Sequence, residues 1–180
     1  YHIAPVWRGE RPQAGRYRQF YQCDIDIIDT NDLPIRCDAE VLAVINEILK
    51  DLELDFEIRI NNKKILDNMI KSILGEDCDL GGVLRIIDKM DKISHEEFCD
   101  QLAKMGVSAD DLQKMLDFFN IISDNDDVIA QLSSMTVSDG FALGVSELSE
   151  LYEGMQAFGI EPRNIRVDLK LARGLTYYTG

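Results

Sequence analysis

Residues 8–20 combine arginines, glycines and an aromatic ring, residue types that together can hold an anion. The arginines of this stretch are Arg8, Arg11, Arg16 and Arg18. A guanidinium group presents a flat fork of donors that matches pairs of phosphate oxygens, and it stays charged when partly desolvated. Gly9 and Gly15 let the backbone approach a ligand closely, and Phe20 can stack on a flat base. A purine nucleotide fits this combination; the alternative is a solvated arginine-rich loop.

The residues that follow place polar groups at strand spacing. Residues 18–28 are rich in aromatic and β-branched side chains and predict a strand, which pairs with a strand over residues 1–8 as a long hairpin. Side chains alternate along a strand. One face therefore carries Arg18, Phe20, Gln22, Asp24 and Asp26. Gln22 and Asp26 lie about 13 Å apart on it and can hold opposite ends of a small polar molecule; the alternative is a wet sheet face.

A second candidate anion-binding group lies near the other end of the chain. Residues 165–171 alternate strictly and predict a strand. Arg173 follows this strand directly before Gly174, and Tyr177 and Tyr178 come next. An arginine at a strand end beside glycine and tyrosines can bind an anion or a substrate. The alternative is an arginine in solvent beside tyrosines of the core.

The elements that must position these groups are mostly helical. Apolar spacing and capping residues predict helices at 39–52, after Asn62, and at 79–90, 94–105, 108–121, 124–134 and 145–158. A further strand is predicted at 56–60. Strands at both ends with helices between them indicate an α+β fold interrupted by an all-helical insertion. We expect the core to comprise 1–74 and 142–180, with the insertion at 75–141.

Composition narrows the classes of function. The chain has 180 residues, of which 46% are hydrophobic, and this excludes a disordered chain, a collagen-like repeat and a coiled-coil rod. Its net charge of −14 should repel nucleic acid over most of the surface. Four separated cysteines with only two histidines predict free thiols and no metal site. Without a leader or a membrane-length apolar run, we expect a cytoplasmic protein with no membrane segment, cut from a longer chain.

Two motifs carry a resemblance to a known family. Val6–Gln22 resembles motif 2 of the class II aminoacyl-tRNA synthetases, in the form found in histidyl-tRNA synthetases. Arg173-Gly-Leu-Thr-Tyr-Tyr178 resembles the histidine-specific motif of that family, with Thr176 where Asp is usual. The resemblance extends over essentially the whole chain. It implies part of the antiparallel class II sheet with flanking helices and a helical insertion, as an internal fragment of the catalytic domain.

The resemblance also implies roles for particular residues. Those implied to bind ATP are Arg8, Glu10, Arg16 and Phe20. Those implied to bind histidine are Gln22, Asp26, Arg173, Tyr177 and Tyr178. Arg8 and Arg173 are implied to be catalytic, because both approach the α-phosphate of ATP. Mg²⁺ is expected to accompany the ATP, and no residue of this chain is implied to be a metal ligand.

The implied activity is ATP-dependent activation of histidine to histidyl-adenylate and its transfer to the histidine tRNA. A homodimer is expected for the full-length protein, and little or no activity for the 180-residue piece alone. The main alternative is a histidine-binding, non-catalytic paralogue, the regulatory subunit of ATP phosphoribosyltransferase. The complete arginine loop and the Arg173–Tyr178 pattern favour the synthetase. A third reading, an acidic helical interaction module, predicts no binding of ATP or histidine.

Overall fold

The computed structural model describes residues 1–9, 11–30, 32–121 and 125–172. Its described strands are β1 (His2–Trp7), β2 (Gln19–Asp24), β3 (Ile58–Ile60) and β4 (Ile165–Val167). The described helices are α1 (Arg36–Asp51), α2 (Lys63–Leu74), α3 (Leu80–Ile87), α4 (His95–Lys104), α5 (Ala109–Phe119), α6 (Asn125–Ser134), α7 (Asp139–Ala157) and the short 3₁₀ helix η1 (Pro162–Asn164). This mixture confirms the α+β fold class. None of these helices combines the length and apolar character that a bilayer crossing needs.

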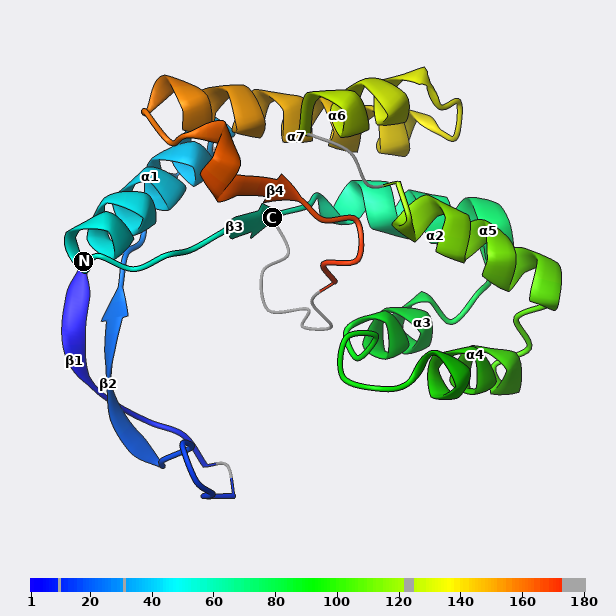
Figure 1. Cartoon of the computed structure of the whole chain (residues 1–180), viewed down its shortest axis with the longest axis horizontal. Helices are drawn as coiled ribbons and strands as arrows, with labels where there is room; N and C mark the ends of the chain where they lie inside the picture. Colours follow the sequence, from blue (N-terminus) through cyan, green and yellow to red (C-terminus); the bar gives the residue numbers. More distant parts are fainter. Residues whose placement is uncertain (10, 31, 122–124, 173–180) are drawn as a thin grey trace.

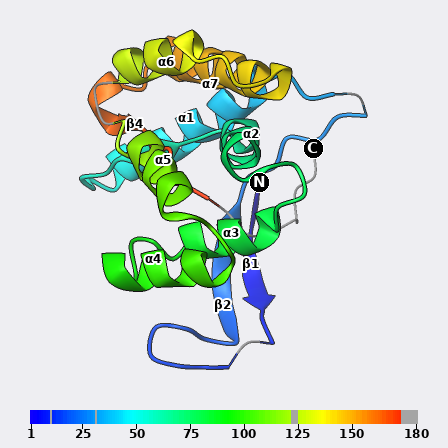
Figure 2. The ribbon, with the colours of Figure 1, turned by 90° about the vertical axis from the view of Figure 1, so that its right-hand side faces the viewer.

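The strands β1 and β2 form the predicted antiparallel hairpin, which projects from the helical part of the molecule (Figure 1, Figure 2). Ala4 lies opposite Gln22, and Val6 lies opposite Phe20. The pairing continues past β1, because the Arg8 amide donates to the Arg18 carbonyl at 2.8 Å. The second strand is shorter than predicted, since β2 ends at Asp24.

The second sheet is a parallel pair, β3 and β4, which lies among the helices (Figure 1). The chain between these strands forms α2 to α7, and a long helical connection is what parallel pairing requires. The flanking residues of each strand are buried, and the central residue is exposed. The two exposed residues, Arg59 and Arg166, are neighbours in register. Glu57 forms ion pairs with both, at 2.9 Å and 3.7 Å.

The core lies in the helical body, where α7 packs along α1 and α2. Glycines let these helices approach closely, because a Cβ at Gly144 would lie 3.0 Å from the backbone nitrogen of Ile65. Side-chain oxygens cap several helix starts, as their sequences predict. Asn62 accepts from the Lys64 amide at 2.9 Å, and Ser94 accepts from the Glu97 amide at 3.1 Å.

Helix α7 begins earlier than the sequence predicts. It starts at Asp139 rather than at residue 145, and Ser138 caps it by accepting from the Phe141 amide at 3.1 Å. Gly140 and Gly144 disfavour a helix in isolation. Packing against α2 overrides that preference, because both glycines face α2 side chains. The division of the chain at 74/75 and 141/142 stays a prediction.

Strand β4 ends sooner than the sequence predicts. The alternation runs to residue 171, but β4 covers only Ile165–Val167. Asp168 turns the chain: its side chain accepts from the Lys170 amide at 3.0 Å, and its carbonyl accepts from the Leu171 amide at 3.0 Å. Such local bonds to an aspartate compete with a strand ladder. Leu169 is nevertheless buried, which explains the apolar alternation.

Glu147 ties α7 to the start of α2, and its environment predicts that the stability of the fold depends on pH. Its carboxylate accepts from Asn62 at 2.8 Å and pairs with Lys64. Burial raises the pKa of Glu147, but these hydrogen bonds and the Lys64 charge outweigh it, so the pKa is lowered overall. Glu147→Gln is expected to destabilise the chain by about 1 kcal/mol at pH 7.

The difference in the free energy of unfolding between the parent chain and Glu147→Gln should shrink as the pH falls. A lowered carboxyl pKa contributes stability that is present above the unfolded-state pKa, about 4.3, and is lost as the pH falls through the folded-state value. Urea unfolding at pH 7 and at about pH 3.5 measures it. Glu150→Gln, on an exposed position of the same helix, is the control. An equal loss for both variants, or a loss independent of pH, would contradict the role of Glu147.

Candidate functional site

Arg8 is the centre of the candidate site, on one face of the hairpin. It follows the last residue of β1, and its Nη2 donates to Oε1 of Gln22 at 3.2 Å. Its guanidinium carbon lies 5.1 Å from the centre of the Phe20 ring, a cation–π contact. These two contacts from β2 orient the guanidinium while the side chain stays exposed. The result is an oriented fork of donors beside an aromatic ring.

Gln22 extends the polar face along β2. Its Nε2 donates to both carboxylate oxygens of Asp24, at 2.6 Å and 2.7 Å. The amide is therefore oriented, with its oxygen toward Arg8 and its nitrogen toward Asp24. The period of two along a strand indicates that Asp24 shares this face, but its role in orienting Gln22 does not follow from sequence. The three β2 side chains on this face, Phe20, Gln22 and Asp24, are half-buried.

Asp26 lies two residues past the end of β2 and is exposed. The strand alternation that places it on the Gln22 face therefore does not extend to it. Its role in holding an ammonium group stays a prediction. Cys23, on the opposite face of β2, is exposed as well.

Arg16 stands at the tip of the hairpin in a tight turn. Its amide donates to the Gln13 carbonyl at 2.9 Å, and the Gln13 amide donates back at 3.1 Å. Gly15 has φ +75°, a left-handed value that glycine adopts without the steric cost of a side chain. Arg16 and Arg11 are both exposed. The turn thus carries one of the predicted phosphate-binding arginines at the far end of the hairpin.

Several predicted site residues lie outside the described residues: Glu10, Arg173, Tyr177 and Tyr178, together with Thr176. The described chain reaches Ala172, next to Arg173. The structure thus brings Arg8, Phe20 and Gln22 together on one face and carries Arg16 at the tip of the same hairpin.

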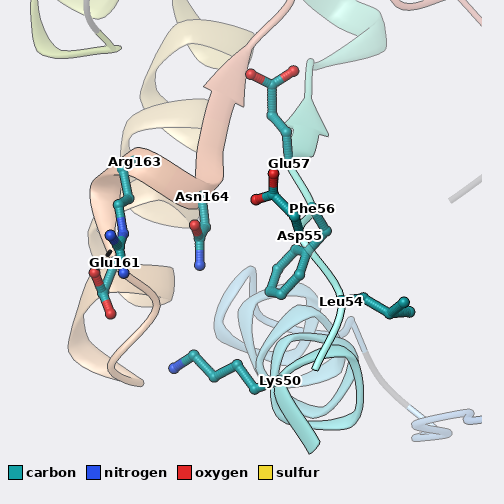
Figure 3. Close-up of a pocket in the computed structure, with 8 residues that line it drawn as sticks. All are labelled: Lys50, Leu54, Asp55, Phe56, Glu57, Glu161, Arg163 and Asn164. Atoms are coloured by element: carbon teal, nitrogen blue, oxygen red, sulfur yellow. Dashed lines mark ion pairs between the residues drawn. The ribbon is translucent and has the colours of Figure 1, made fainter. Parts of the chain in front are cut away.

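An open pocket of 710 Å³ lies elsewhere, between the end of α1, the approach to β3, and η1 (Figure 3). Its lining residues are Lys50, Leu54, Asp55, Phe56, Glu57, Glu161, Arg163 and Asn164. Charges of both signs line it, and Arg163 is already paired with Glu161 at 2.8 Å. None of the residues singled out from the sequence lines this pocket, so the hairpin remains the candidate site.

Comparison with known proteins gives a match over the whole chain. The family model described as Histidyl-tRNA synthetase matches residues 1–180. The histidine–tRNA ligase of Finegoldia magna is 42% identical over 182 residues, covering 100% of this chain and 42% of that protein. That of Clostridium tetani is also 42% identical, covering 100% of this chain and 41% of that protein. The chain thus spans about two fifths of the length of these relatives.

Two solved structures resemble the fold. A histidyl-tRNA synthetase from Nostoc sp. is 36% identical with a TM-score of 0.89, covering 99% of this chain and 41% of that one. A protein from Bacillus halodurans, described as an ATP phosphoribosyltransferase regulatory subunit/histidyl-tRNA synthetase, is 18% identical with a TM-score of 0.78. It covers 99% of this chain and 45% of that one, and at this identity it supports the fold alone.

Proposed function

The chain belongs to the histidyl-tRNA synthetase family, and on this premise we propose that the longer protein carrying it activates histidine with ATP and transfers it to the histidine tRNA. The observation that carries the proposal is the guanidinium of Arg8, held between the Phe20 ring and the Gln22 amide. A pre-oriented fork beside an aromatic ring suits a nucleotide whose phosphate and base must both be held.

The first step is a displacement at phosphorus. A carboxylate oxygen of histidine attacks the α-phosphorus of ATP, the bond to the β-phosphate breaks, and pyrophosphate leaves. Arg8 donates to the α-phosphate oxygens, where negative charge gathers in the transition state. Phe20 stacks on adenine. Arg16 engages the outer phosphates, and Glu10 helps to hold the adenine end. In the second step, a hydroxyl of the terminal tRNA adenosine attacks the acyl carbon, and AMP leaves.

The histidine substrate occupies the next part of the same face. Gln22 presents an amide whose orientation Arg8 and Asp24 set, so it can meet a polar group of the amino acid with a defined donor or acceptor. Asp26 is the proposed partner of the ammonium group. Arg173, Tyr177 and Tyr178 complete the pocket in this proposal. Arg173 contributes a second positive charge toward the α-phosphate and is the second catalytic residue.

Mg²⁺ is proposed to arrive with ATP rather than to occupy a site made by this chain alone. Within the described ranges, no three His, Cys, Asp or Glu side chains gather closely enough to hold a metal ion. In nucleotide enzymes Mg²⁺ is usually bound by one or two carboxylates together with the substrate phosphates. The ion would neutralise phosphate charge.

We also propose a cytoplasmic homodimer for the longer protein, with the 180-residue piece inactive alone.

Histidine-dependent exchange of pyrophosphate into ATP tests the proposal. The longer protein is expected to catalyse the exchange with histidine and to show background exchange with other amino acids. The 180-residue chain, assayed alone, is expected to give background only. Binding of histidine by the longer protein without exchange would instead support a non-catalytic regulatory role. Binding of neither histidine nor ATP would overturn both assignments.

A further inference from the structure

Asn125, the first residue of α6, is bonded to a strand forty residues further along the chain. Its Nδ2 donates to the Ile165 carbonyl at 2.8 Å. Its Oδ1 accepts from the Val167 amide, also at 2.8 Å. Only one orientation of the amide matches both partners, so the two bonds fix the side chain. Asn125 is half-buried, and it joins the helical part of the chain to β4.

The two bonds occupy the edge of β4 that β3 leaves open. Successive residues of a strand turn their backbone groups to opposite edges. The Asp168 amide donates to the Ile60 carbonyl at 2.9 Å, toward β3. The Ile165 carbonyl and the Val167 amide therefore face away from β3, toward Asn125. The side-chain amide thus takes the place of a neighbouring strand beside a β4 of only three residues.

A second asparagine holds the segment that follows β4. Asn61 lies directly after β3, and its Nδ2 donates to the Leu171 carbonyl at 3.1 Å and to the Leu169 carbonyl at 3.5 Å. Leu171 is two residues before Arg173 in the sequence. The chain leading to Arg173 is therefore held by Asn125 at its start and by Asn61 at its end.

We propose that Asn125 is a positioning residue for histidine activation: by bonding to β4 from the start of α6, it fixes the described chain that precedes Arg173 in the sequence. The inference rests on the proposed function. No contact of Asn125 with ATP or histidine is proposed, so its effect on the reaction must act through Arg173. A small displacement of a charge-neutralising group near the α-phosphate slows a displacement strongly, because catalysis depends on orientation. The start of α6, far from the hairpin in sequence, is then needed for the first step of the reaction.

The test uses the longer protein in the exchange assay, with Asn125→Ala and the control Asn120→Ala. Asn120 is exposed, just past the end of α5. Asn125→Ala is expected to lower kcat by about tenfold to a hundredfold with little change in the KM for ATP. Asn120→Ala should match the parent. If the parent itself shows no exchange, the proposed function fails. If the parent is active and Asn125→Ala equals it, or if both variants lose kcat equally, this inference fails.

Amide hydrogen exchange separates positioning from unfolding. In Asn125→Ala, the Val167 amide should lose protection, whereas the Asp168 amide, bonded to Ile60, should keep it. Loss of protection at both would mean that the strand melts, which overturns the positioning role. If the alanine variant does not fold, the nearly isosteric Asn125→Asp decides. It keeps the acceptor for the Val167 amide but sets a charged carboxylate oxygen against the Ile165 carbonyl. A lowered kcat at an unchanged KM then supports the inference, and a parental kcat overturns it.

Discussion

Replacing Arg8 by alanine is expected to lower kcat/KM for histidine-dependent ATP–pyrophosphate exchange by about a hundredfold to a thousandfold, the range seen when one charge-stabilising donor is removed. The side chain is held by Gln22 and by the Phe20 ring, so its donors are oriented before ATP binds. Arg8→Lys should recover only part of the loss. An ammonium group keeps the charge but cannot donate in a flat fork. Exchange kinetics of the longer protein measure both variants.

Arg11→Ala is the matched control for Arg8. Arg11 is an exposed arginine of the same hairpin, and no ATP contact is proposed for it. Its removal lowers the local positive charge by the same amount, so little change is expected in kcat/KM. Equal losses for Arg8→Ala and Arg11→Ala would show that only the summed charge of the loop matters. Full recovery of activity by Arg8→Lys would show the same.

The hairpin could be predicted because its signals are local. Aromatic and β-branched residues flank a segment rich in glycine and arginine, and the register follows from a period of two. This period predicts that Phe20 and Gln22 share a face, and in the structure both contact Arg8. The same period fails for Asp26, because β2 ends at Asp24. A strand end depends on where pairing stops, and the residues between 18 and 28 do not encode it by themselves.

The contacts made across long sequence distances could not be predicted. A helix starting near residue 124 follows from local signals, but the bonds from Asn125 to Ile165 and Val167 join segments about forty residues apart. Asparagine at a helix start ordinarily indicates a cap. The early start of α7 has the same cause. Gly140 and Gly144 have a low helix propensity, and only their packing against α2 accounts for their place in the helix. Propensity is a weak signal that tertiary packing overrides.

Gly144→Ala is expected to destabilise the chain by about 1–3 kcal/mol, although alanine normally favours a helix interior by about 1 kcal/mol. A Cβ at this position would lie 2.9 Å from Lys64 Cβ, 3.0 Å from Ile65 Cγ1 and 3.0 Å from the Ile65 backbone nitrogen. Backbone in the first turn of α2 cannot move without disturbing the helix, so α7 must shift outward. Urea unfolding of the chain at pH 7 measures the loss.

Gly81→Ala is the matched control for Gly144, because its Cβ would meet only Arg85 Nη1 at 3.5 Å and Asp79 Oδ1 at 3.8 Å. Those are ordinary contacts, so this variant should be as stable as the parent or slightly more so. A gain in stability for both variants would contradict the close approach of α2 and α7. Glu147 lies one turn after Gly144 and bonds to Lys64. Moving α7 outward should break that pair. The double variant Gly144→Ala/Glu147→Gln should therefore lose less stability than the sum of the losses of the two single variants.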